Sequence, residues 1–253
     1  THETTGQISY LNLSGLSSIT NCSSNDNQTS NLFIDGCSSL TNFDIRNNLI
    51  TSLEIANNSN LNSVQIHGNP MTKLDLSGCT NFSQLDLQSF SGSTTPIPLD
   101  SVNLSGCSSL TGFLDLNGPE LSSTGNTTGQ LAYLTVTGCS SLSELHCNGH
   151  LLASLDLTGC SSLTFLSCSS NQITNPDLAC CPSVQNLIIH DNLMTSLEIT
   201  NNNSLTFVGL GVNPMTKLDL SGCTSLTSLL TESYSTPASQ LTLDSVNLSG
   251  CSS

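Results

Sequence analysis

Short segments of the type Leu-x-Leu-x-Gly-Cys recur along this chain with a constant 21-residue period. The last position of the segment falls at Leu16, Cys37, Asn58 and Cys79, and again at Cys139, Cys160, Cys181, Asn202 and Cys223. A constant period of roughly 20 to 50 residues is typical of solenoids, in which each coil packs only against its neighbours. The spacing therefore predicts one elongated repeat domain over residues 1–253.

Each period contains two short segments in which apolar and polar residues alternate. We call them half A, as in residues 74–79, and half B, as in residues 64–69. Alternation is typical of strands with one buried face, and the Gly, Asn and Ser between the halves favour turns. Because no segment keeps a helical spacing of apolar residues, we expect an all-β solenoid with little or no helix. About eleven coils, each with two short strands stacked in parallel about 4.8 Å apart, would extend roughly 50 Å.

Two columns of small polar residues mark the corners of the predicted coils. Tight corners leave backbone groups that an Asn amide can satisfy and a thiol can satisfy weakly. We therefore predict two structural ladders, with the corner cysteines buried and reduced. The half-A ladder contains Cys37, Cys79, Cys107, Cys139, Cys160, Cys181, Cys223 and Cys251, with Asn at 58 and 202. The half-B ladder contains Asn27, Asn48, Asn69, His150, Asn171, Asn192 and Asn213.

The remaining cysteines leave alternatives open. Cys147 and Cys168 share one inward half-B position a period apart, so stacking would bring their Cα atoms to about 5 Å, within disulfide range. Both a disulfide and two thiols fit that spacing. Cys180 and Cys181 are adjacent, and a disulfide between neighbours would be unusual. Because no Cys-x-x-Cys pair is present, the sequence gives little support for a zinc site.

The repeat resembles the leucine-rich repeat, whose consensus is Leu-x-x-Leu-x-Leu-x-x-Asn/Cys-x-Leu. Residues 165–173 match half B of its nested 21-residue form, often called IRREKO-type, and residues 217–223 match half A. The resemblance covers nearly the whole chain and implies a leucine-rich-repeat-like solenoid. This form is common in bacterial surface proteins, so the resemblance also implies extracellular binding, adhesion or assembly.

The array is itself duplicated. Residues 71–79 recur at 215–223 and residues 100–109 at 244–253, which predicts a duplication of 1–123 by 124–253 and membership in a longer array. Three inserts lengthen the steps between coils, at 89–99, 118–131 and 233–243. We expect them to bulge from the surface and to contact a neighbour or a ligand. They include Phe90, Pro96, Pro98, Tyr234 and Pro237.

Charge excludes some classes of partner. The formal net charge is −15 with only three Lys and Arg residues, so binding to nucleic acid is not expected. No apolar run approaches the length of a membrane span. Few lysines among abundant Ser, Thr and Asn favour an extracellular or cell-surface location. Basic partners and divalent cations remain compatible with this composition.

An acidic ladder occupies the outward position of half A. Four of its carboxylates follow one another from residue 156 to 219, and like charges on adjacent strands destabilise each other. We consider two interpretations: a strip that binds Ca²⁺ or a cationic partner, and a solvated strip that keeps the chain soluble. The candidate residues are Glu54, Asp75, Asp156, Asp177, Glu198 and Asp219.

The motifs that usually mark catalysis are missing: the sequence has no Gly-x-Ser-x-Gly elbow, phosphate loop or His-Glu-x-x-His. We therefore predict a protein that is not an enzyme and has no cofactor, with Ca²⁺ as the one ion considered. The preferred function is an extracellular structural or adhesive scaffold that assembles with itself end to end or forms part of a long adhesin. The alternatives are a binding module for an extracellular protein or glycan, and an ice-binding solenoid.

Overall fold

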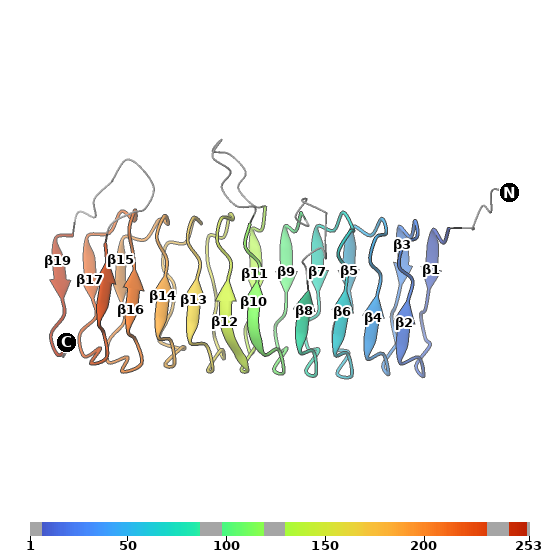
Figure 1. The fold of residues 1–253 in the computed structure, drawn as a ribbon, viewed down its shortest axis with the longest axis horizontal. Helices are drawn as coiled ribbons and strands as arrows, with labels where there is room; N and C mark the ends of the chain where they lie inside the picture. The colour runs from blue at the N-terminus through green and yellow to red at the C-terminus, as the bar shows by residue number, and fades with distance from the viewer. Residues whose placement is uncertain (1–6, 87–97, 119–129, 232–242, 252–253) are drawn as a thin grey trace. The chain divides into compact units, whose positions relative to one another are not determined.

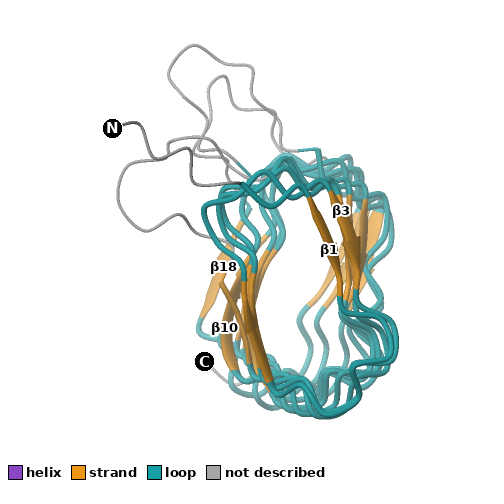
Figure 2. Cartoon of the chain, turned by 90° about the vertical axis from the view of Figure 1, so that its right-hand side faces the viewer, coloured by secondary structure: helices purple, strands orange, loops and turns teal. Residues whose placement is uncertain are grey.

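The computed structural model describes residues 7–86, 98–118, 130–231 and 243–251 (Figure 1). They contain nineteen short strands and no helix. The chain divides into two compact units, residues 1–110 and 111–253, and each is described by itself. In both units the strands lie on two opposite sides of the coils and are joined by loops (Figure 2). The predicted all-β solenoid is thus confirmed.

In the first unit, half-A and half-B strands alternate along the chain. The half-B strands form one parallel sheet in the order β2-β4-β6-β8. Among the half-A strands, β1 pairs with β3, and β7 lies between β5 and β9. The half-A strands are β1 (Tyr10–Asn12), β3 (Asn31–Phe33), β5 (Ser52–Glu54), β7 (Lys73–Asp75) and β9 (Ser101–Asn103). The half-B strands are β2 (Asn21–Ser23), β4 (Asn42–Asp44), β6 (Ser63–Gln65) and β8 (Gln84–Asp86).

In the second unit, the half-B strands form a six-stranded parallel sheet in the order β10-β12-β13-β14-β16-β18. The half-A strands β15, β17 and β19 form a parallel sheet of their own. The half-B strands are β10 (Gly112–Asp115), β12 (Leu142–His146), β13 (Phe165–Ser167), β14 (Asn186–Ile188), β16 (Phe207–Gly209) and β18 (Ser228–Leu230). The half-A strands are β11 (Tyr133–Thr135), β15 (Ser196–Glu198), β17 (Lys217–Asp219) and β19 (Ser245–Asn247).

Equivalent apolar residues lie one above another, as the period predicts. Leu145 pairs with Leu166, and Leu166 pairs with Leu187, each one repeat further along the chain. All three side chains are fully buried. Where an insert lengthens the chain the register is kept, because Leu74 pairs with Val102 and Leu218 pairs with Val246. The core of each unit is therefore a stack of apolar rows between its two strand layers.

The two corner ladders satisfy buried backbone groups. Asn171 donates from Nδ2 to the Cys147 carbonyl of the preceding coil at 2.8 Å and accepts the Leu152 N–H at 3.1 Å. The corner cysteines also reach the preceding coil: Cys79 Sγ donates to the Ile55 carbonyl at 3.0 Å. Asn58 keeps the register by a different bond, from Nδ2 to the Cys37 carbonyl at 2.9 Å. Both ladders therefore join each coil to the one before it.

In the structure the cysteines are thiols, including the pairs Cys147/Cys168 and Cys180/Cys181. All twelve cysteines are free, and most are buried. Burial raises the pKa of Cys147 to about 12 and that of Cys168 well above its usual value. The Sγ atoms of Cys180 and Cys181 lie 3.6 Å apart without a bond between them.

One interruption was not expected from the period. Pro176 occupies the inward position that is Leu or Val in the other half-A segments, and neither it nor Asp177 belongs to a strand. Proline has no N–H to donate to the ladder, so the pairing stops there. Most of the predicted bulging inserts, including Phe90, Pro96, Tyr234 and Pro237, lie outside the described residues. Pro98 is described and exposed.

Candidate binding surface

The six-stranded sheet of the second unit presents two rows of outward side chains, which we call the aromatic face. Its inward positions are apolar, and because side chains alternate along a strand, the residues on either side point out. The first row runs across the strands as Phe113, Glu144, Phe165, Asn186, Phe207 and Ser228. The second row runs as Asp115, His146, Ser167, Ile188, Gly209 and Leu230.

Three rings gather at one end of this face. His146 lies edge-on to Phe113, with ring centroids 4.6 Å apart, and stacks parallel to Phe165 at 4.8 Å. These geometries are favourable for ring pairs and hold the imidazole in place. Phe113 nevertheless remains 54% exposed. The cluster is therefore an ordered apolar patch that solvent can reach.

A carboxylate lies between the two phenylalanines. Glu144 pairs in register with Phe113 on one side and Phe165 on the other. Its side chain is about half exposed, and its Oε2 lies 3.9 Å from His146 Nε2. That nitrogen is buried and has no hydrogen-bond partner. This end of the face thus combines ring surface, one negative charge and an unsatisfied polar atom.

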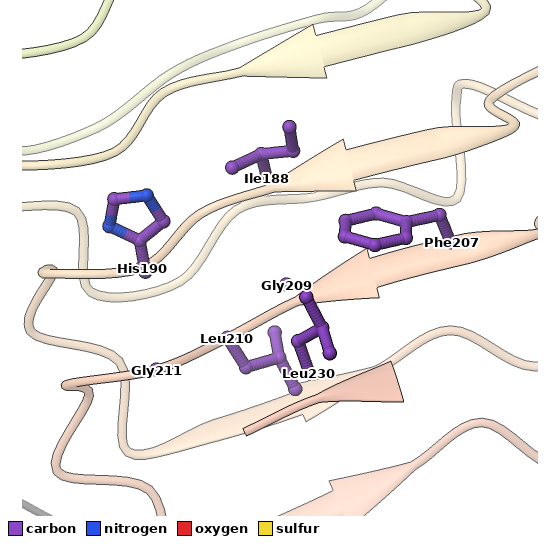
Figure 3. Close-up of a pocket in the computed structure, with 7 residues that line it drawn as sticks. All are labelled: Ile188, His190, Phe207, Gly209, Leu210, Gly211 and Leu230. Atoms are coloured by element: carbon purple, nitrogen blue, oxygen red, sulfur yellow. The ribbon is translucent and has the colours of Figure 1, made fainter. Parts of the chain in front are cut away.

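A hollow of about 300 Å³ lies further along the same face, where Gly209 stands in place of a side chain (Figure 3). Ile188 and Leu230, its neighbours in the second row, form the apolar walls, and Phe207 and His190 also line it. The backbone does not require glycine here, because Gly209 does not have the positive φ of the corner glycines. A Cβ would come to 3.4 Å from Cε1 of Phe207, a close but tolerable contact. Strand glycines of this kind often mark close approach of a ligand or another backbone.

Polar contacts fix the turns that border this face. Asn148 donates to Asn117 Oδ1 at 2.8 Å, and its own Oδ1 accepts from Ser167 Oγ at 2.9 Å and the Ser169 N–H at 2.6 Å. Near the hollow, His190 Nδ1 lies 2.8 Å from Asp191 Oδ2. The turns that border the face are therefore held in place by hydrogen bonds between side chains.

The acidic ladder lies on the half-A strands and is less regular than predicted. Glu54 pairs with Asp75, and Glu198 pairs with Asp219. Asp156 forms only an isolated bridge to Thr135, and Asp177 belongs to no strand. The expected run of four carboxylates on adjacent strands is therefore interrupted.

The aspartates of this ladder have partners within their own turns. Thr158 donates to Asp156, with the backbone N–H at 2.9 Å, and holds the pKa of that carboxyl below its usual value. The Ser221 backbone N–H does the same for Asp219, and the Asn247 amide adds a bond at 3.1 Å. Repulsion is thus offset by donors within the chain. The binding role predicted for this ladder stays a prediction.

The described residues hold neither a metal-binding group nor a membrane-spanning helix. Within them, no three His, Cys, Asp or Glu side chains are grouped so that they could hold a metal ion. In the same part of the chain, no helix could cross a lipid bilayer.

Sequence reasoning missed the aromatic face. Phe165 and Phe207 lie a whole number of periods apart, but Phe113 and Phe165 do not, so the three form no single column in the sequence. They share a row only because the insert makes the step from β10 to β12 longer than one period, with a register shift after Gly112. One signal in the sequence could have indicated this face: Phe recurs two coils apart at the outward position of half B.

The stacked parallel strands, the buried leucine rows and the Asn and Cys corners define a leucine-rich-repeat solenoid. No family model matches the sequence, and no curated protein matches it. Among solved structures, the functional domain of InlJ from Listeria monocytogenes, which includes a cysteine ladder, matches with 20% identity and a TM-score of 0.42. That match covers 85% of this chain and 54% of that domain, so this chain spans about half of its length.

Two further solved structures are similar in fold. The internalin InlF from Listeria monocytogenes matches with 22% identity and a TM-score of 0.41, over 86% of this chain and 68% of that one. A leucine-rich repeat protein from Leptospira interrogans matches with 20% identity and a TM-score of 0.37, over 81% and 64%. These likenesses concern the fold alone.

Proposed function

We propose that this chain is an extracellular, non-enzymatic adhesive scaffold that binds a protein partner through the aromatic face. The observation that carries the proposal is an ordered group of exposed rings next to an apolar hollow on one sheet. Phe113 is 54% exposed beside two other rings, and an apolar hollow lies on the same sheet. Exposed apolar patches with polar borders mark interaction sites, and aromatic anchors dominate the energy of protein interfaces.

A protein partner fits this surface better than a glycan does. Aromatic rings serve both kinds of ligand, but the walls of the hollow are the aliphatic side chains of Ile188 and Leu230. Such walls favour an apolar side chain over a hydroxylated sugar, which would lose its hydrogen bonds to water there. Repeat solenoids present extended surfaces suited to such binding.

The test uses the immobilised protein against a panel of purified extracellular proteins and an array of glycans. A protein ligand is expected, with Phe113→Ser and Gly209→Leu each weakening binding about tenfold or more, as for loss of an interface anchor. Phe33→Ser is the matched control, because Phe33 is 45% exposed on β3 of the other unit. Binding confined to glycans, or unchanged in both face variants, would contradict the proposal.

End-to-end assembly is a second candidate, favoured by the apolar residues of one exposed strand. Val246 on β19 is 49% exposed and Leu248 is 40% exposed. Their counterparts one coil earlier, Leu218 and Leu220, are 1% and 0% exposed. A further coil seated on β19 would bury this surface and pair its backbone edge, and the proposal is that a second copy of the chain supplies that coil.

A further inference from the structure

Resting on the proposed function, we infer that the aromatic face accepts an extended basic segment of its protein partner. One cationic side chain of that segment lies over Glu144 between Phe113 and Phe165. One apolar side chain, four positions away, enters the hollow at Gly209.

The Glu144 end is chemically suited to a guanidinium or ammonium group. The two phenylalanines flank Glu144 on neighbouring strands, and its carboxylate is half exposed. Ring faces attract cations, and a carboxylate in the same place adds a charge-assisted hydrogen bond. A cation bound to Glu144 would lie beside the ring cluster that His146 forms with Phe113 and Phe165.

Charge complementarity points to the same occupant. The two rows of the aromatic face contain the carboxylates of Asp115 and Glu144 but no Lys or Arg. The chain as a whole has a formal charge of −15. An acidic segment would be repelled from this surface, whereas a basic one would be attracted and steered toward it.

The second anchor follows from the glycine. Gly209 has an ordinary strand conformation and room for a Cβ, yet it carries no side chain. A glycine inside a strand costs stability relative to alanine, and the backbone conformation gives no reason for a glycine here. The hollow between Ile188 and Leu230 has the size and apolar lining for one Leu-sized or Phe-sized side chain.

The spacing of the two sites fixes the pattern of the segment. Glu144 and Gly209 lie three strand steps apart, from β12 through β13 and β14 to β16. With about 4.8 Å per step and an offset of about two residues along the strand, the separation is about 16 Å. An extended chain of about four residues covers about 13 Å, and a long cationic side chain covers the rest. Side chains four positions apart in an extended chain also point to the same side.

The test titrates two blocked pentapeptides of equal composition into the full ¹⁵N-labelled chain and follows amide shifts by NMR. In Arg-Gly-Ser-Gly-Leu the two anchors are four positions apart, and in Gly-Ser-Gly-Arg-Leu they are adjacent. The spaced peptide is expected to shift residues around Glu144 and Gly209 and to bind about fivefold more tightly than the other. Equal affinity of the two peptides would overturn the spacing.

Variants separate a specific site from the net charge of the chain. Glu144→Gln is expected to weaken the spaced peptide about fivefold. Glu198→Gln is the matched control, because Glu198 is an exposed carboxylate on the half-A side of the same unit and should leave the affinity unchanged. Equal losses in both variants would show attraction by net charge alone and would overturn the inference. In Gly209→Leu the spaced peptide should bind no more tightly than the peptide with adjacent anchors. If Gly209→Leu lowers the melting temperature, Leu230→Gln serves as a second test of the hollow.

The experiments distinguish binding of a protein partner from recognition of a basic segment. If a protein partner is lost on Phe113→Ser but neither peptide shifts the face, the binding function stands and the basic segment is wrong. If neither protein nor peptide responds to the face variants, both are wrong.

Discussion

At the scale of single residues, the outward position of half A is decided by turn geometry. Asp75 accepts the N–H of Ser77 at 3.0 Å, and Asn103 accepts that of Ser105 at 3.1 Å. Asp and Asn side chains commonly stabilise a turn in this way. Glutamate at this position behaves differently. Glu54 forms an ion pair with Lys73 at 2.7 Å, and the turn that follows Glu54 contains Asn57 with a positive φ. Both Asp and Asn occur in this ladder because either side chain can close the turn.

This role predicts an acid sensitivity of known sign. The folded pKa values of Asp156 and Asp219 lie below the unfolded value, so their stabilisation is present above that value. This stabilisation is lost as the pH falls through the pKa of the folded state. We therefore expect the melting temperature to decrease once the pH is below about 4. In the double variant Asp156→Asn and Asp219→Asn, the turn acceptors remain but no longer titrate. We expect the variant to lose less melting temperature than the wild type between pH 6 and pH 3.

Calorimetry or circular dichroism across that pH range measures the difference. The matched control is Glu198→Gln, whose carboxylate closes no turn and should leave the slope unchanged. Identical pH profiles for wild type and double variant would show that the aspartates are solvated charges without a folding role.

At the scale of the elements, the half-B Asn ladder joins the coils. Asn171 donates to three carbonyls, of Cys147, Cys168 and Ser169, and accepts one N–H, all in a buried corner. Asn202 at a half-A corner accepts the N–H groups of Ser204 and Leu205, both in its own turn. The first residue therefore connects two coils, whereas the second closes one turn.

We expect Asn171→Ala to lower the free energy of unfolding by about 3 kcal/mol, because buried carbonyl and N–H groups lose their partner. Asn202→Ala should cost about 1 kcal/mol, the value of a more exposed turn contact. Urea denaturation followed by circular dichroism gives both values. Equal losses for the two variants would contradict the distinction between these two corner residues.

The sequence predicted the elements well wherever one residue type repeats at one position. Leucine rows and Asn or Cys corners gave the period, the two strands per coil and the register, since each core position needs the same chemistry in every coil. Pro176 broke that rule at one coil, and the loss of pairing around it depends on a missing N–H. The aromatic face depends on how β10 pairs with β12 across the insert between them. The spacing of residues in the sequence does not show that pairing, so it could not place Phe113 and Phe165 in one row.

At the scale of the whole molecule, the proposed end-to-end assembly predicts how the particle mass depends on concentration. Val246 lies on β19 and Leu248 directly follows it, and both side chains are exposed. If copies add to β19, the particle mass should rise with protein concentration in light scattering, and chains of particles should appear by electron microscopy. Val246→Glu should abolish this growth, because burying an unpaired carboxylate is unfavourable.

The control for assembly is Phe113→Ser, which alters an exposed apolar residue far from β19 in sequence and should leave the growth intact. Particles that stay at the mass of one chain at every concentration would contradict assembly. Growth that Phe113→Ser removes would instead assign self-association to the aromatic face.

The register across the inserts has a consequence for evolution. Lys73 pairs with Ser101 and Lys217 with Ser245, although each of these steps along the chain is longer than one repeat period. The extra residues enter the connection between successive coils, so sequence can lengthen there while the leucine rows stay in line. A protein built in this way can acquire new recognition loops by insertion without redesign of its interior.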